Sequence, residues 1–137
     1  MTLKKRSIKC ACAADGSFTG TLGLGAAYGM VKAIRWDSGA DSSSDLTISS
    51  SLPAYDSGNA AKTHAIFTRT GVDASAAGGV VMYVVPVEGE TYDSAGEVAA
   101  ANNGEAGDGL VAHSPLTLTI ANGGTSETHY VDVFVEV

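Results

Sequence analysis

Alternation of apolar and polar residues recurs along most of this 137-residue chain. A period of two is typical of strands that turn one face to a core and the other to solvent. No stretch of ten or more residues keeps a helical period, and only 97–104 is a candidate for a short helix. The segments that we expect to form strands are 7–13, 28–36, 46–48, 64–70, 80–85, 116–120 and 131–137.

The last two segments predict a hairpin at the C-terminal end of the chain. Apolar residues alternate with threonines over 116–120, residues 121–127 have the composition of a turn, and valines then occupy every second position to Val137. A shift of one residue in the pairing would expose all four valines, so we expect the last strand to be held in a sheet.

A second hairpin, with a long polar connection, is predicted from 28–36 and 46–48. Few other large side chains are available to fill an alanine-rich interior, so Trp36 is expected in the core rather than in a subunit contact. The residues expected to share one face of the first strand, interrupted only by Lys32, are Tyr28, Met30, Ile34 and Trp36.

Short strands separated by polar turns predict an all-β fold, either an antiparallel β-sandwich or a jelly-roll or barrel-like domain. We expect about seven or eight strands with little helix, and the 17 glycines agree with a core crossed by many turns. The length suits one domain that buries a sizeable core. Within it we expect a basic N-terminal arm over 1–14, which leads into the first strand, and a single β domain over 15–137.

Charge is distributed unevenly along the chain, whose net charge is −7. Lys4, Lys5, Arg6 and Lys9 supply four of the eight basic residues, and the C-terminal half holds ten carboxylates with no basic residue. Nucleic-acid binding requires many lysines and arginines against phosphates, so we expect none here. The four N-terminal basic residues either contact an acidic partner or form a solvated terminal segment.

Neither a membrane span nor an export signal is expected. The apolar runs are far shorter than the roughly 20 residues that cross a bilayer, and Lys9 and Asp15 interrupt the segment that a signal peptide would need. Cys10 and Cys12 lie too close on one strand for an ordinary disulfide, and two thiols are too few for a zinc site. Both are expected to be small core residues.

The candidate metal-binding and catalytic motifs fall short of a complete set. Asp37, Asp41 and Asp45 lack the ligand spacing and terminal glutamate of a calcium-binding EF-hand loop. Asp56-Ser57-Gly58 resembles a fragment of serine-hydrolase loops but lacks their glycine elbow, and His64 lies too close in sequence to indicate a triad. We therefore expect neither enzyme activity nor a metal site.

The glycine-rich stretch 23–29 misses the dinucleotide-binding pattern by one residue and precedes a strand, so we expect a loop and no cofactor. His64, His113 and His129 fall in three separate segments and show no ligand spacing. Each is expected to be a half-exposed strand residue.

Three stretches carry a resemblance to a known class of proteins: GMVKAIRWDSGADSSSDLTIS, VVMYVVPVEGETYDSAG and GLVAHSPLTLTIANGGTSETHYVDVFVEV. A strand that ends near an aromatic residue leads through a polar loop into a D-x-T-I type strand, a tyrosine and a proline lie in mid-chain, and a hairpin closes the C-terminus. In these respects residues 28–137 resemble small virion accessory proteins of tailed bacteriophages, of the capsid decoration or cement kind. Residues 1–27 have no counterpart in the pattern, and 78–109 is unusually acidic for it.

The resemblance implies a non-catalytic structural protein that is made in the host cytoplasm and lies on the capsid surface of the virion. Its expected partners are the major capsid protein, whose lattice it would stabilise, and further copies of itself in a homotrimer, with neither nucleic acid nor membrane involved. The residues expected to contact a neighbouring subunit are Lys4, Lys5, Arg6 and Lys9. The alternatives are another virion component, such as a head fibre, connector or tail protein, or a β-sandwich carbohydrate-binding or adhesion module.

Overall fold

A computed structural model of the chain describes residues 2–38, 43–52, 62–72, 80–84 and 110–137. These residues contain no helix, and the predicted all-β antiparallel sandwich is confirmed. The helix candidate 97–104 lies outside the described residues. The nine described strands are β1 (Leu3–Ala11), β2 (Phe18–Leu22), β3 (Tyr28–Ser38), β4 (Ser44–Leu52), β5 (Lys62–Val72), β6 (Val80–Val84), β7 (Leu110–His113), β8 (Leu116–Ala121) and β9 (Thr128–Glu136).

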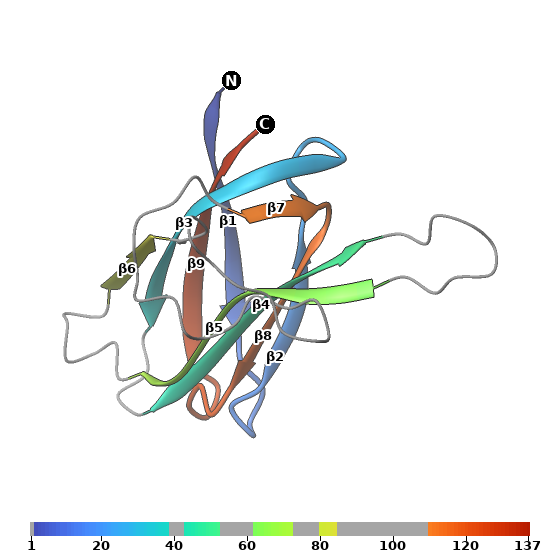
Figure 1. The fold of residues 1–137 in the computed structure, drawn as a ribbon. Coiled ribbons are helices and arrows are strands. Elements are labelled where there is room, and N and C mark those ends of the chain that lie inside the picture. The colour runs from blue at the N-terminus through green and yellow to red at the C-terminus, as the bar shows by residue number, and fades with distance from the viewer. Residues whose placement is uncertain (1, 39–42, 53–61, 73–79, 85–109) are drawn as a thin grey trace.

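The strands form two antiparallel sheets that pack face to face (Figure 1). The first sheet has the order β1-β9-β3-β6, with β7 also paired to β3, and the second has the order β2-β8-β4-β5. Most connections between consecutive strands therefore cross from one sheet to the other. Among the described strands, β4 and β5 are the one pair that is both consecutive and hydrogen-bonded within its sheet.

Both predicted hairpins are wrong. β8 belongs to the second sheet and β9 to the first, and β3 and β4 are likewise in different sheets. The turn between β8 and β9 has positive φ at Asn122, Gly124 and Ser126, and it carries the chain across the sandwich. Alternation shows only that one face of a strand is buried, and this is equally true of strands that pair and of strands that pack face to face.

The core lies between the inner faces of the two sheets. Trp36 is fully buried there, as predicted, together with Ile34 from the same strand. The other fully buried aliphatic residues of the strands come from β8 and β4 on one side and from β9, β3 and β7 on the other: Leu46, Ile48, Leu116, Leu118, Ile120, Val31, Ala112, Val131, Val133 and Val135. The valine and leucine alternations that mark the C-terminal strands are thus two halves of one core.

A β-bulge at Lys32 divides β3 into two parts. Val31 and Ala33 pair with two consecutive residues of β9, which leaves Lys32 as an extra residue. Val31 before the bulge and Ile34 after it are both fully buried, although three positions separate them. The prediction of one shared face is therefore wrong for the two residues that precede the bulge and lie on the opposite side, Tyr28 and Met30.

The two ends of the described chain lie side by side (Figure 1). β1 pairs with β9 over its whole length, and Thr2 and Val137 exchange two backbone hydrogen bonds beyond it. The prediction that the C-terminal strand is held in a sheet is confirmed. The first strand begins at Leu3 rather than Ser7, so the predicted basic arm is for most of its length an edge strand.

Two strands were not expected from the sequence. β2 is short and contains a glycine, and β7 has only four residues, so neither shows a sustained alternation. The predicted loop over 23–29 is confirmed as far as residue 27, because it connects β2 to β3 and contains Gly25 with φ of 83°.

Candidate protein-binding face

The four basic residues expected to act together are divided between two sides of β1. Side chains alternate along a strand, and Ile8, Cys10 and Cys12 face the core. Lys4 and Arg6 therefore lie on the inner side, near the margin of the sandwich. Lys5 and Lys9 lie on the outer face, which we define as the side of the first sheet that is turned away from the second sheet. A partner that docks on one side meets only two of the four.

All four large hydrophobic side chains that are exposed in the described part of the chain lie on this outer face. Leu3, Tyr28, Val111 and Tyr130 come from four different strands, and each is 50–58% exposed. Scattered exposed hydrophobics are ordinary, but their collection on one face is typical of an interaction surface. Tyrosine in particular is enriched at protein interfaces.

Cross-strand register brings most of these residues to one end of the outer face. Leu3 of β1 and Met30 of β3 both lie opposite Glu136 of β9, and Val111 of β7 lies opposite Met30. Beyond this row, the rings of Tyr28 and His113 meet edge to face with centroids 4.9 Å apart. The half-buried position of His113 agrees with its prediction. Apart from the Glu136 carboxylate in the middle of the row, the side chains named at this end of the face, which we call its apolar end, are apolar or aromatic.

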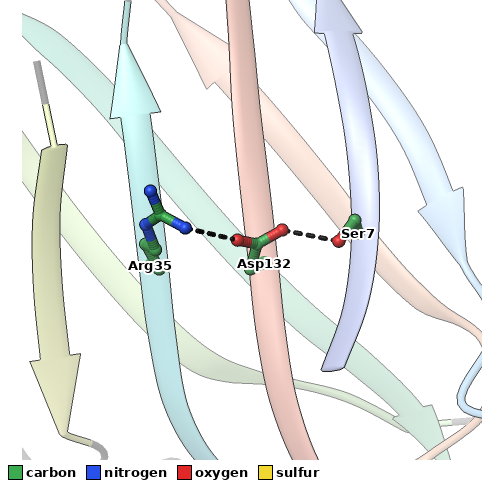
Figure 2. Close-up of polar contacts among 3 residues, drawn as sticks. All are labelled: Ser7, Arg35 and Asp132. Atoms are coloured by element: carbon green, nitrogen blue, oxygen red, sulfur yellow. Dashed lines mark hydrogen bonds and ion pairs between the residues drawn. The ribbon is translucent and has the colours of Figure 1, made fainter. Parts of the chain in front are cut away.

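The middle of the outer face is polar and ordered by hydrogen bonds. Figure 2 shows Ser7, Asp132 and Arg35 in one row across β1, β9 and β3. The Ser7 hydroxyl donates to Asp132 Oδ1 at 2.6 Å, and Arg35 Nη1 lies 3.4 Å from the other carboxylate oxygen. Exposed ion pairs add little stability, commonly less than about 1 kcal/mol. Here these contacts join side chains of three neighbouring strands across the centre of the face.

The outer face is close to neutral, although the chain as a whole carries a charge of −7. Lys32 is drawn to this face by an ion pair in which its Nζ lies 3.6 Å from Glu136 Oε2. The face therefore holds four basic and three acidic side chains on β1, β3 and β9: Lys5, Lys9, Lys32, Arg35, Asp37, Asp132 and Glu136. Half of the eight basic residues lie on this side of the molecule.

His129 is fully buried, so its prediction as a half-exposed residue is wrong. The Trp36 Nε1–H donates to His129 Nδ1 at 2.9 Å, and His129 Nε2 lies 2.8 Å from the carbonyl oxygen of Gly123. Because a carbonyl only accepts, Nε2 carries the proton and Nδ1 is the acceptor. Both ring nitrogens are thus occupied by protein groups in the core, which is a structural role. The burial of His129 could have been predicted from the sequence, because it lies two residues before Val131 in the alternation that buries the valines of β9.

Cys10 and Cys12 are free thiols, and both are buried as predicted. Burial raises the pKa of Cys10 from its ordinary 9.0 to about 12, with a smaller contribution from Cys12. The pKa of Cys12 is raised as well, mainly by burial. A protonated thiol is a poor nucleophile and a poor metal ligand, so neither cysteine is prepared for such chemistry.

We expect iodoacetamide to alkylate Cys10 at pH 8 at least about 100-fold more slowly in the folded protein than in urea, because little thiolate forms. The raised pKa of Cys10 also makes the free energy of unfolding depend on pH. Its contribution is fully present below the pKa of the unfolded thiol, and it is lost as pH rises towards 12 because the unfolded thiol loses its proton more readily than the folded one. A Cys12→Ser variant isolates the reaction for mass spectrometry. Equal rates in buffer and in urea would contradict this assignment.

The aspartates considered for a metal site do not lie together in the described structure. Asp45 accepts hydrogen bonds from the Gly71 amide at 2.8 Å and from Asn122 Nδ2 at 3.1 Å, which ties β4 to β5 and to the turn after β8. Asp37 lies on the outer face beside Tyr130, and Asp41 lies outside the described residues. Among the described residues, no three His, Cys, Asp or Glu side chains gather as a metal site would require.

The remaining catalytic candidates lie beyond what the structure describes, since residues 53–61 include Asp56-Ser57-Gly58 and the side chain of His64 is not placed. Within the described ranges, no helix is long and apolar enough to span a membrane. Comparison of the whole chain with known proteins finds no matching family model, no matching curated protein and no matching solved structure.

Proposed function

We propose that this protein is a non-catalytic structural component of a tailed-bacteriophage virion, a capsid decoration or cement protein that binds the major capsid protein lattice. The observation that carries the proposal is the collection of Leu3, Tyr28, Val111 and Tyr130, all at least half exposed, on the outer face of one sheet. A face of this kind suits a protein partner, and the sequence resemblance points to the virion as its setting.

The proposed mechanism is stabilisation by binding. A protein that binds the assembled lattice but not its dissociated subunits stabilises the assembled state by mass action. In this proposal the protein is made in the host cytoplasm, forms a homotrimer and occupies the capsid surface. The apolar end of the outer face supplies buried contact area, and the fixed row of Ser7, Asp132 and Arg35 supplies orientation.

A single charge on the outer face tests this proposal. Val111→Glu is expected to reduce binding to particles assembled without the protein by at least about tenfold, because a carboxylate would be desolvated in an apolar contact. Bound copies per particle are counted after sedimentation, and the heat resistance of the particles is measured in parallel. The point variant is sharper than deletion of residues 1–9, which would remove most of β1 from the sheet.

Thr119→Glu is the matched control. Thr119 is also an exposed strand residue, but it lies on the outward side of the second sheet. The control is expected to bind particles as well as the unaltered protein. Full occupancy by Val111→Glu, or an equal loss in both variants, would overturn the assignment of the outer face as the docking surface.

A further inference from the structure

We propose that the free edge of β1 pairs with an acidic extended segment of a partner protein, which adds a strand to the first sheet. This inference rests on the proposal that the protein binds another protein, and it names the chemistry of the segment that is bound. β1 pairs with β9 on one side, and no described strand pairs with its other edge. Such an edge is a ready template for strand addition.

The register shows which backbone groups of β1 are available. Thr2 and Val137 exchange two backbone hydrogen bonds, and the Cys12 amide donates to Glu127 at 2.9 Å. In an antiparallel pair such bonded positions recur at every second residue, so Arg6 and Ile8 bond to β9. The amides and carbonyls that point to the free edge are those of the alternate residues, Leu3, Lys5, Ser7 and Lys9.

Charge along this edge selects an acidic occupant. β1 contains four basic residues and no carboxylate. An added strand would place side chains beside Lys5 and Lys9 on the outer face and beside Lys4 and Arg6 on the other side. Carboxylates at those positions would meet opposite charges on both sides of the strand.

Arg6 gives the most specific indication. Its Nε is buried and has no hydrogen-bond partner, and no ion pair joins it to a carboxylate among the described residues. The guanidinium lies against Gly25, where a Cβ would collide with Nη2. A charged side chain without a counter-charge in a partly buried position is costly, and a carboxylate on an added strand beside Arg6 would bring an opposite charge to its guanidinium. Opposite Arg6 an added strand forms a non-hydrogen-bonded pair, in which side chains approach closely.

Pairing of two β1 strands about Ser7 is unfavourable. Two β1 strands paired antiparallel about Ser7 would set Lys5 of one copy opposite Lys9 of the other, and like charges directly opposite are destabilising. The occupant that we infer is an acidic segment of a different protein, because its carboxylates would meet the four basic side chains of β1. In an antiparallel arrangement, acidic residues opposite Lys9, Arg6 and Lys5 have the spacing E-x-x-E-E.

The peptide acetyl-TVETVEETV-amide is a direct probe of the edge. Added to nitrogen-15-labelled protein at up to about 1 mM, a range in which weak complexes are detected, it is expected to shift the amide signals of Lys5, Ser7 and Lys9. The same amides should gain protection from hydrogen exchange. The amides of Arg6 and Ile8 should gain none, because they already bond to β9. Absence of shifts would overturn the inference.

Ser7→Pro removes one free-edge amide, and proline is tolerated where a strand amide faces away from its neighbour. We expect it to weaken binding of the peptide by at least about tenfold, because the hydrogen bonds of strand addition are lost. Ser7→Ala removes the hydroxyl bonded to Asp132 but keeps the amide, and it should bind as well as the unaltered protein. Equal binding by the proline and alanine variants, with β1 still paired to β9, would contradict strand addition.

Charge exchange provides a test that does not depend on a proline. A peptide in which lysine replaces the two glutamates opposite Lys5 and Lys9, with the glutamate opposite Arg6 kept, should not bind the unaltered protein, but it should bind a Lys5→Glu/Lys9→Glu variant. Equal binding of both peptides to the unaltered protein would overturn the acidic specificity. These assays contain no capsid, so their failure would leave the outer-face proposal standing, and full capsid occupancy by Val111→Glu would leave the edge inference standing.

Discussion

Replacement of His129 by leucine is expected to lower the free energy of unfolding by about 2–5 kcal/mol, because two buried polar groups lose their partner at once. The Trp36 Nε1–H and the Gly123 carbonyl would both face an aliphatic side chain. The imidazole also stacks on the indole, with ring centroids 5.9 Å apart, and this contact would change as well. Urea denaturation followed by circular dichroism measures the effect.

A double-mutant cycle separates the hydrogen bond from general loss of packing. Trp36→Phe alone leaves His129 Nδ1 without its donor, whereas Trp36→Phe combined with His129→Leu removes both partners. The combined loss should be smaller than the sum of the two single losses by about 1 kcal/mol or more, since groups in contact are not independent. A cost below about 1 kcal/mol for His129→Leu would show that the buried network is not a main source of stability.

Leu118→Ala is expected to cost about 2–5 kcal/mol, as is usual when a fully buried leucine is truncated and a cavity remains. Leu118 lies in the middle of β8, between β2 and β4, and is completely buried. Its side chain belongs to the core shared with the valines of β9. The loss should therefore appear as a lower midpoint of urea denaturation with an unchanged slope.

Thr119→Ala is the control for this experiment, because Thr119 is the next residue on the same strand and is exposed. Its substitution should change the free energy of unfolding by less than about 0.5 kcal/mol. Similar costs for Leu118→Ala and Thr119→Ala would mean that β8 does not turn Leu118 into the sandwich. The two variants together thus test the orientation of a strand whose pairing was not predicted correctly.

The sequence alone indicated part of the candidate surface. The charge pattern marked Lys5 and Lys9 together with Lys4 and Arg6, but it could not show that a strand would divide them between two sides. The exposed residues of the outer face are separated by up to 127 positions along the chain, from Leu3 to Tyr130. They come together only through the order β1-β9-β3-β7, which local patterns do not encode.

Local patterns were sufficient for what each segment does by itself. Alternation of valines over 131–137 and of apolar residues over 116–120 determined that both are strands with one buried face. The shortage of large core side chains placed Trp36 inside, and the spacing of Cys10 and Cys12 placed both thiols on one buried side. Fold class follows from the sum of such segments.

Only the tertiary structure showed which strands pair, which face of each strand is buried and which distant side chains form hydrogen bonds. A strand with one buried face alternates with a period of two whether the next strand in the sequence lies beside it or across the core. The alternation therefore could not show that the chain crosses from one sheet to the other between β8 and β9. One extra residue at Lys32 reversed the faces of β3, and the burial of His129 depended on an indole donor 93 positions away. The sequence determined that this chain forms a β-sandwich, whereas long-range register decided which side chains share the outer face and which strand lies at the edge of the first sheet.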